Sequence, residues 1–319
     1  MAVRHFAIRG FMRLASVSVA GGCAAETGSF LDPQGPIAAA QLSNLYEVTA
    51  VTMIAVLPVL VLVPLILWRY RYKNSNAEYA PGWDESRTLD LFMWGIPFAI
   101  VAFLGVLLWR STTLLDPYRP LDPAVEATRV QVVGLDWKWL FIYPDEGIAT
   151  VGELAFPADV PLALELTSDT VMQSLIIGAL GGQIYAMPGM QTQLNLSAET
   201  PGSFFGENMQ YSGEGFHTQT FMANAMSAAD YADWLASVRQ VAVSLDTTAY
   251  STLAERSTKD EVRAAFPTAV MSNGTVAFMF EDADLFNAIM APYRGSSAIP
   301  PTSQPGSPAY RPLTSIGNP

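Results

Sequence analysis

Residues 204–223, FFGENMQYSGEGFHTQTFMA, have the residue types of a metal-binding loop. Small residues alternate with polar ones, His217 lies near the end, and methionines stand on either side of it. Imidazole and soft sulfur groups are ligands that suit copper. The rest of the chain offers few such groups, because it holds one cysteine, Cys23, and only one other histidine, His5. One cysteine also excludes an internal disulfide.

The first 22 residues have the organisation of a secretory signal peptide. A front rich in arginine is followed by the apolar run 14–20 and by two glycines. Cys23 directly after these small residues resembles a bacterial lipoprotein box, in which the cysteine is acylated, for instance with palmitate, and becomes the new N-terminus. Ala20 stands where leucine is usual in that box. The alternative is a buried N-terminal cysteine, with the signal cut elsewhere or not at all.

Removal of residues 1–22 leaves one histidine and one cysteine in the mature chain. A mononuclear blue copper site requires two histidines and one cysteine, and a dinuclear site requires two bridging thiolates. The residue counts therefore exclude both kinds of copper site. Loss of three arginines takes the net charge from −12 to −15. A chain this acidic has no basic face for nucleic acid, so no nucleic-acid partner is expected.

Two apolar segments, 48–68 and 89–109, have the length of transmembrane helices. Each has 21 residues, which at ~1.5 Å per residue gives about 31 Å, the thickness of a hydrocarbon core. The connecting loop 69–88 is basic and is therefore expected in the cytoplasm. The hairpin then turns inside, and both the N-terminal segment 23–47 and everything after Arg110 lie in the periplasm of the inner membrane.

Beyond the hairpin the sequence pattern changes twice. Short β-branched or aromatic runs between turn residues over 125–226 predict an all-β sandwich or barrel. Apolar residues three and four apart predict helices over 227–291, at 227–243, 258–266 and 281–293. The segment 292–319 is rich in Pro, Ser and Gly and is expected to be a disordered tail.

The order of these parts resembles subunit II of the haem–copper oxidases. The motifs LDPQGPIAAAQ, PGWDESRTLDLFMWGIPFAI, DWKWLFIYPDEGIATVGELAFP, GGQIYAMPGMQTQL and YSGEGF are similar to subunit II of the cytochrome bo/ba-type ubiquinol oxidases. The resemblance extends from Cys23 to Tyr293. It implies a membrane-anchored α+β fold, in which a two-span helical hairpin precedes a cupredoxin-like β-sandwich and a short helical C-terminal region.

In copper-bearing members of that superfamily the loop has the pattern C-x-E-x-C-x3-H-x2-M, with a further histidine upstream. Placed on this chain, none of the six positions holds the required residue, and they fall at Gln173, Asn208, Gln210, Ser212, Phe216 and Gln219. No metal and no cofactor is therefore expected in this chain. His217, one place beyond the ligand position, is expected at the surface, and four methionines are expected to be flexible core filler: Met187, Met190, Met209 and Met222.

The resemblance implies a subunit without a redox centre in a proton-translocating ubiquinol oxidase. Haems and copper would lie in subunit I, and the partners would be subunits I, III and IV, membrane lipid and ubiquinol. Two alternatives remain open: a copper-carrying subunit II of a cytochrome c oxidase, and a stand-alone tethered binding lipoprotein. The missing ligands disfavour the first alternative, and the lipid anchor plus hairpin disfavours the second.

Two further features have a functional and a structural interpretation each. Asp90 aligns with a carboxylate at the mouth of a proton channel in the family, and an ionisable group at a span is costly. Asp90 could equally mark the end of the span. Alternation in DWKWLFIYP predicts that Trp137 and Trp139 share one strand face with Phe141 and Tyr143. That face would pack against subunit I or form an ordinary sandwich core.

Overall fold

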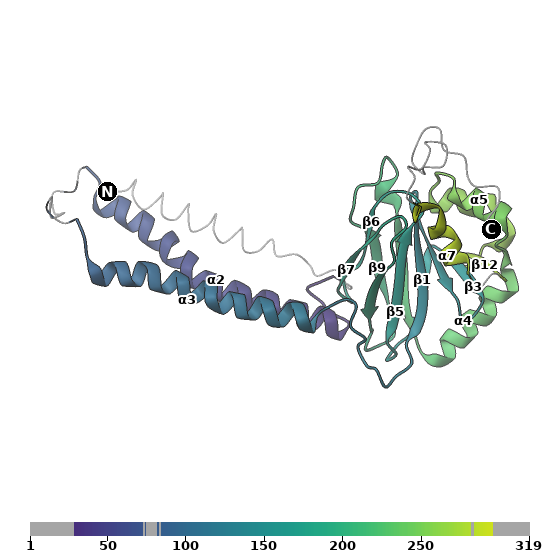
Figure 1. Ribbon diagram of the computed structural model, residues 1–319, viewed down its shortest axis with the longest axis horizontal. Helices are drawn as coiled ribbons and strands as arrows, with labels where there is room; N and C mark the ends of the chain where they lie inside the picture. The colour runs from purple at the N-terminus through teal and green to yellow at the C-terminus, as the bar shows by residue number, and fades with distance from the viewer. Residues whose placement is uncertain (1–28, 73, 75–81, 83, 282–283, 296–319) are drawn as a thin grey trace, which may run out of the picture.

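The computed structural model describes residues 29–281 and 284–295, apart from 73, 75–81 and 83. The expectations for the signal peptide, for Cys23 and for residues 296–319 of the tail lie outside the described residues, whereas the first two residues of the predicted tail 292–319 belong to a short 3-10 helix. Figure 1 shows two long helices side by side that lead into a β-sandwich with helices on its far side.

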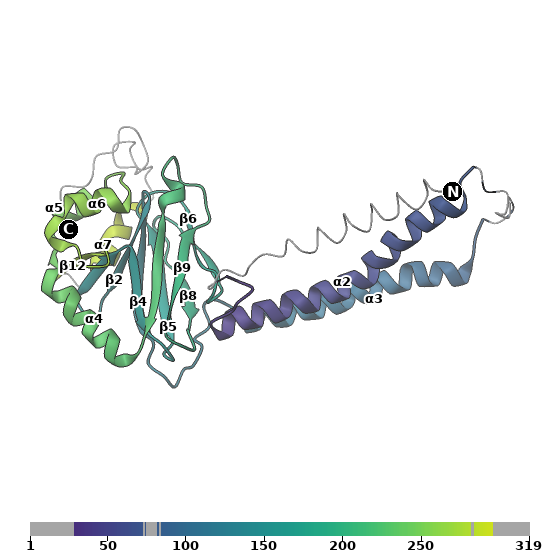
Figure 2. The ribbon, with the colours of Figure 1, turned by 180° about the vertical axis from the view of Figure 1, so that it is seen from behind.

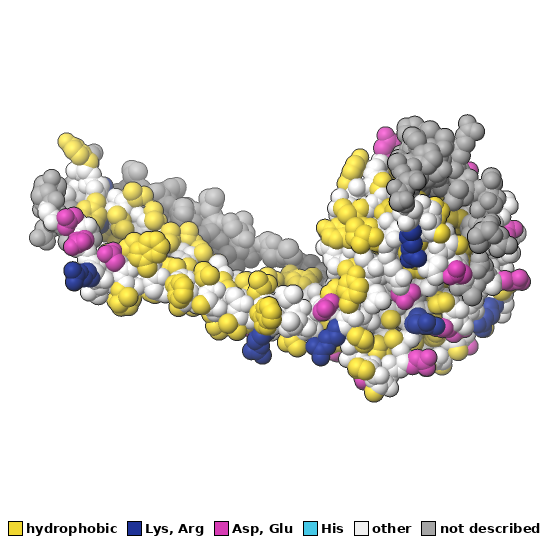
Figure 3. All heavy atoms as spheres, viewed as in Figure 1, with side chains coloured by type: hydrophobic (Ala, Val, Ile, Leu, Met, Phe, Trp, Pro, Cys, Tyr) yellow, Lys and Arg dark blue, Asp and Glu magenta, His cyan; other side chains and the backbone are white. Residues whose placement is uncertain are grey.

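The two helices are α2 (Pro36–Arg69) and α3 (Arg87–Leu114). Within the described residues, these two are long and apolar enough to cross a membrane, with hydropathies of 2.8 and 2.4, and none of their most apolar windows is buried. Both extend past the predicted spans 48–68 and 89–109, because helix-forming residues continue beyond the apolar stretch. Apolar side chains are spread along the face of the helices seen in Figure 3, so this surface needs lipid or another protein around it.

The strands form two sheets that pack face to face (Figures 1 and 2). Among the described residues, one sheet has the order β11-β12-β3-β2-β1-β5-β8 and the other β4-β10-β9-β6-β7. Pairing is parallel in β1–β5, β4–β10 and β11–β12 and antiparallel elsewhere. The first six strands are β1 (Thr128–Leu135), β2 (Lys138–Tyr143), β3 (Ile148–Val151), β4 (Glu153–Pro157), β5 (Leu162–Ser168) and β6 (Gln173–Ile177). The others are β7 (Gln183–Ala186), β8 (Thr192–Leu196), β9 (Gly202–Asn208), β10 (Thr220–Met226), β11 (Val243–Ser244) and β12 (Val276–Met279).

An aromatic cluster fills the space between the two sheets. The ring of Phe221 on β10 lies 4.9 Å from that of Phe141 and 6.4 Å from that of Trp139, both on β2. Gly206 on the neighbouring strand provides the room, because a Cβ there would lie 2.2 Å from the Phe221 ring. The alternation of the β2 sequence thus directs Trp139 and Phe141 into the core, where they join the aliphatic residues of both sheets.

The C-terminal region contains the predicted helices and also completes the seven-stranded sheet. The predictions at 227–243, 258–266 and 281–293 correspond to α4 (Ala228–Val241), α6 (Lys259–Ala265) and α7 (Leu285–Met290). In addition, α5 (Thr247–Ala254) and the short 3-10 helices η2 (Pro267–Ala269) and η3 (Ala291–Tyr293) form in this region, and a further 3-10 helix, η1 (Phe216–Thr218), precedes β10. Because β12 pairs with β3, the β-domain extends past the predicted end at 226.

Backbone hydrogen bonds join the start of α2 to the sandwich. The N–H of Gln34 donates to the carbonyl of Ala179 at 2.8 Å, and the N–H of Glu199 donates to the carbonyl of Gln34 at 3.1 Å. A Cβ on Gly35 would lie 2.1 Å from the carbonyl oxygen of Ser197, so only glycine permits this approach. The hairpin and the sandwich are therefore in direct contact at this junction.

Replacing Phe221 with Ala is expected to lower the free energy of unfolding of the sandwich by about 3–5 kcal/mol, because the surrounding sheets can close only part of the cavity. Phe205 on the adjacent strand is 49% exposed, and its replacement with Ala serves as the control, with an expected effect below about 1 kcal/mol. Thermal unfolding of the detergent-solubilised chain measures both. Equal effects would contradict the assignment of Phe221 to the core.

Candidate functional site

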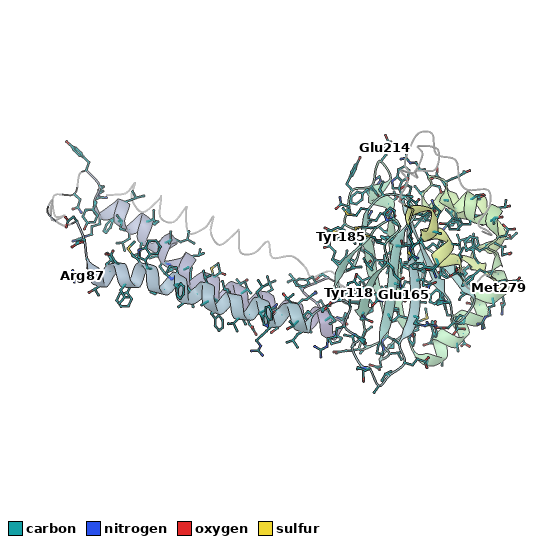
Figure 4. All side chains as sticks on the ribbon, in the orientation of Figure 1. Arg87, Tyr118, Glu165, Tyr185, Glu214 and Met279 are labelled. Carbon is teal, nitrogen blue, oxygen red and sulfur yellow. The ribbon has the colours of Figure 1, made fainter. Side chains whose placement is uncertain are left out.

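Three amide side chains meet at the end of the sandwich to which the loop 209–219 belongs; Glu214, labelled in Figure 4, lies in this loop. Gln173 begins β6, Asn208 ends β9, and Gln219 directly precedes β10. Asn208 Nδ2 donates to Gln219 Oε1 at 2.9 Å, and Gln219 Nε2 donates to Gln173 Oε1. All three side chains are buried, at 3% exposure or less. This amide cluster joins three elements of the five-stranded sheet and its loop.

Backbone and hydroxyl groups satisfy the remaining hydrogen-bonding capacity of the amide cluster. Gln173 Nε2 donates to Leu135 O at 3.1 Å and to Thr170 Oγ1 at 2.8 Å. Gln219 Nε2 also approaches the same Leu135 carbonyl and the Lys138 carbonyl, each at 3.3 Å. Asn208 Oδ1 accepts from the backbone N–H groups of residues 174 and 210, each at 2.9 Å. Each amide therefore has internal partners, as buried polar groups require.

The three residues of the amide cluster stand at positions where the family pattern predicted copper ligands to be replaced. Ser212, at a fourth position, borders the amide cluster, since its hydroxyl lies 3.2 Å from Asn208 Nδ2 and 3.3 Å from Gln219 Oε1. Amide nitrogens have no free lone pair for a metal, and amide oxygens are hard ligands that suit magnesium or calcium rather than copper. The donor set does not fit a copper centre. Within the residues that the structure describes, no group of three or more His, Cys, Asp or Glu side chains could hold a metal.

The side chains at the other two ligand positions take no part in the hydrogen bonds of the amide cluster. The side chain of Gln210 is half-buried, and the ring of Phe216 in η1 packs against that of Tyr211 at 5.8 Å. His217 follows Phe216 and is exposed, as predicted. The prediction that the methionines fill the core is wrong for three of them, since exposed fractions are 52% for Met190, 51% for Met209 and 40% for Met222, while Met187 is half-buried.

The prediction that Trp137 shares a strand face with Trp139 is wrong. Trp137 precedes β2 in a tight turn with a φ of 85°. Its indole N–H donates to Ser212 O at 3.1 Å, and its ring covers Gly215, where a Cβ would lie only 2.2 Å away. Trp137 therefore holds the loop 209–219 against the β1–β2 turn. A left-handed backbone of this kind is rare outside glycine, and the alternation of residue types does not reveal it.

Trp139 is 1% exposed and lies in the sandwich core with Phe141 and Tyr143. A contact between its side chain and another subunit is therefore incompatible with this structure, and the core interpretation of the aromatic strand holds for these three residues. The hydroxyl of Tyr143 donates to Ala155 O at 3.0 Å and accepts from Ala155 N–H at 2.9 Å. This pair of bonds satisfies the one polar atom that the ring carries into the core.

A buried lysine lies beside the amide cluster and was not predicted from the sequence. Lys138 is 2% exposed, and its Nζ donates to the carbonyls of Asp136 and Glu255, both at 2.8 Å, and to Ser257 Oγ at 2.9 Å. Burial lowers the pKa of Lys138 to about 7, while the nearby acids oppose that change. The oxygens around Nζ match the donors of a charged ammonium. A lysine inside an aromatic strand, WKWLF, is the sequence signal that could have revealed it.

Two buried carboxylates, Asp136 and Asp169, lie near the end of β1, where the Asp169 N–H donates to the Gly134 carbonyl. The buried Asp136 pairs with Arg256 at 3.0 Å. Asp169 accepts hydrogen bonds from the hydroxyls of Tyr250 at 2.7 Å and Tyr293 at 2.8 Å. Burial raises the pKa of Asp169 to about 6, although both tyrosine hydroxyls act to lower it. These contacts connect the β-turns next to the amide cluster with α5, the 255–257 segment and η3.

Asp90 lies in the first turn of α3, at the end of the hairpin remote from the sandwich, where Arg87 is labelled in Figure 4. The hydroxyl of Ser86 caps this helix by accepting from the Leu89 N–H. A carboxylate in a first turn interacts favourably with the helix dipole. That interaction suits the structural interpretation of Asp90, and its exposed position leaves it accessible to water and to a partner subunit.

Curated relatives align with most of this chain. It is 42% identical over 252 residues to the cytochrome bo(3) ubiquinol oxidase subunit 2 of Pseudomonas aeruginosa, covering 79% of this chain and 75% of that protein. It is 38% identical over 288 residues to the ubiquinol oxidase subunit 2 of Acetobacter aceti, covering 90% and 88%. No protein-family model matches. A solved periplasmic domain of cytochrome oxidase subunit II from Bradyrhizobium japonicum matches 36% of this chain and 96% of its own length, at 19% identity and a TM-score of 0.35.

The architecture is a cupredoxin-like sandwich on a hairpin of two span-length helices, with buried amides at positions where the sequence comparison predicted copper ligands to be replaced. The chain belongs to the family of ubiquinol oxidase subunit 2. Its expected fold class is thereby confirmed.

Replacing Gln219 with Ala is expected to cost about 1–3 kcal/mol of stability, because buried partners in Asn208 and Gln173 lose their hydrogen bonds. Gln210 lies in the same loop, and the bonds of the amide cluster do not use its side chain. Gln210→Ala is therefore the control, expected within about 0.5 kcal/mol of the parent. Chemical unfolding of both variants measures these changes. A Gln219→Ala variant as stable as the parent would show that the hydrogen bonds of the cluster contribute nothing to stability.

The raised pKa of Asp169 gives a pH dependence of stability with a defined sign. The folded chain holds this proton up to about pH 6, whereas an aspartate at its ordinary value of 3.8 releases it earlier. Stability should therefore rise as pH falls through this window, by at most about 3 kcal/mol. Asp169→Asn should remove that gain, and the exposed Asp233→Asn should keep it. Unfolding measured between pH 4 and 7 tests this, and parallel curves for Asp169→Asn and the parent would contradict it.

Proposed function

We propose that this chain is the subunit II of a ubiquinol oxidase complex and that it carries no electrons itself. The complex oxidises ubiquinol, reduces dioxygen to water and moves protons outward. The observation that carries the proposal is the amide cluster, which fills the candidate metal site with groups that cannot bind copper. Family membership supplies the reaction of the complex.

A sandwich held by amides has no centre to receive electrons from a periplasmic protein. Ubiquinol dissolves in the membrane, so it can reach a partner subunit directly within the bilayer. The haems and the catalytic copper are therefore assigned to subunit I. The chemistry of the donor set also disfavours the alternative of a copper-carrying cytochrome c oxidase subunit.

The role of this chain is then assembly and support in the bacterial inner membrane. The two span-length helices leave their apolar surface open, with Leu91 at 71%, Phe98 at 77% and Trp109 at 74% exposure. That surface suits packing against subunit I and lipid, with subunits III and IV completing the complex. The sandwich faces the periplasm in this arrangement. Acylation of Cys23 would add an anchor on the same side of the membrane.

The experiment that tests the function is gentle purification of the complex, followed by turnover with two electron donors. Ubiquinol is expected to support rapid oxygen consumption, and a reduced soluble cytochrome c is not. The control is the same preparation with a quinol-site inhibitor, which should abolish the ubiquinol rate. Cytochrome-driven turnover would show that the sandwich accepts electrons after all. Recovery of this chain alone, with no haem-bearing subunit, would support the tethered-lipoprotein alternative.

Asp90 is proposed to take part in proton uptake at the cytoplasmic end of α3. Asp90→Asn keeps the size of the side chain and removes its charge, and it is expected to lower proton pumping several-fold relative to oxygen consumption. Glu85→Gln, a nearby exposed acid before the helix, is the matched control and should leave the ratio unchanged. Pumping measured in reconstituted vesicles decides, and equal ratios in both variants would leave Asp90 a charge that marks the end of the span.

A further inference from the structure

A cavity lies between α2 and α3 at the end of the hairpin near the sandwich. Its volume is about 280 Å³. It is lined by polar residues of α2 and α3 and by leucines of α3, among them Ser43, Asn44, Glu47, Leu107, Arg110 and Ser111. None of these residues belongs to the amide cluster or to the predicted proton path.

A hydrogen bond between the helices forms one wall of the cavity. The hydroxyl of Ser111 donates to Asn44 Oδ1 at 2.9 Å and to the Leu107 carbonyl at 2.8 Å. Asn44, Leu107 and Ser111 are half-buried, whereas most of the helix surface is exposed. The helices are therefore held together here, beside the cavity.

Glu47 and Arg110 bring opposite charges to the same cavity without touching one another. Both are exposed, and among the described residues neither takes part in an ion pair or a side-chain hydrogen bond. Both charges line the same cavity, yet their charged groups are not within the 4 Å of an ion pair. A carboxylate and a guanidinium that line one cavity of about 280 Å³ suit a ligand that carries both a cation and an anion.

The position along the hairpin indicates which ligand is available. Glu47 directly precedes the apolar stretch 48–68, and Arg110 directly follows 89–109. Both therefore lie at the level of the lipid headgroups on the side of the sandwich. An arginine fork matches a phosphate in a bidentate manner, and a carboxylate accepts charge-assisted hydrogen bonds from an ammonium. Leu107 and Leu114 give the cavity an apolar side toward the acyl region.

We propose that this cavity binds the headgroup of one zwitterionic aminophospholipid, with its phosphate at Arg110 and its ammonium at Glu47. The bound lipid would hold the outer ends of α2 and α3 in register. The same part of α2 contacts the sandwich, because Gln41 Oε1 accepts from the Gly182 N–H and Ala38 is fully buried. The lipid would thus stabilise the placement of the sandwich on the hairpin. This inference stands independently of the electron donor that the complex uses.

The test is native mass spectrometry of the purified complex after delipidation and reloading from equimolar phosphatidylethanolamine and phosphatidylglycerol. The parent is expected to bind phosphatidylethanolamine at one site about tenfold more tightly than phosphatidylglycerol. That ratio corresponds to one charge-assisted hydrogen bond. Phosphatidylcholine, whose trimethylammonium donates no hydrogen bond, should bind more weakly. A parent complex with no preference for phosphatidylethanolamine over phosphatidylglycerol would overturn the proposal. This result needs no variant, so it does not depend on whether a variant assembles.

Variants separate the two ends of the proposed ligand. Glu47→Gln should abolish the preference for phosphatidylethanolamine over phosphatidylglycerol and leave binding of the latter intact. Arg110→Gln should weaken both lipids, and Arg110→Lys should restore part of the binding because it keeps the charge and loses the fork. Arg119→Gln, beyond the end of α3, is the control and should change neither. Identical retention in all four variants would overturn the proposal.

Discussion

The hydrogen bonds between three buried amides hold the loop 209–219 in place without a metal ion. A polar side chain deep in a sandwich must find partners, and the cost of leaving one unpaired is a large part of the stability of a domain. Gln173, Asn208 and Gln219 satisfy one another at the end where three strands and a long loop meet. Because those bonds use the amide groups, a loop that resembles a metal site is ordered by the chain itself.

Buried ionic groups next to the amide cluster form hydrogen bonds with the C-terminal helical region. The ammonium of Lys138 bonds to the 255–257 segment, and the carboxylate of Asp169 holds Tyr250 and Tyr293. Glu153 has a comparable role on the other sheet, where Trp234, Asn273 and Thr275 donate to its Oε2. Each of these contacts links residues more than 80 positions apart. The helical region is therefore an integral part of the β-domain.

The sequence was sufficient to predict the elements that follow from the spacing of apolar residues and from the counts of Cys and His. Apolar length predicted α2 and α3, short β-branched runs between turn residues predicted the sandwich, and apolar residues three and four apart predicted α4 and α6. It was insufficient for Trp137, whose turn reverses the alternation, and for β12, a four-residue strand defined by its pairing with β3. The partners of Lys138 and Asp169 come from distant segments, so local patterns could not identify them.

One spectrum tests the central claim most directly. Air-oxidised, purified complex should show no near-infrared absorption beyond that of its haems, because the amide cluster offers no thiolate pair to hold mixed-valence copper. Addition of copper salt should not create such a band. A near-infrared band that disappears on reduction and tracks with copper in the separated subunit II would contradict the account.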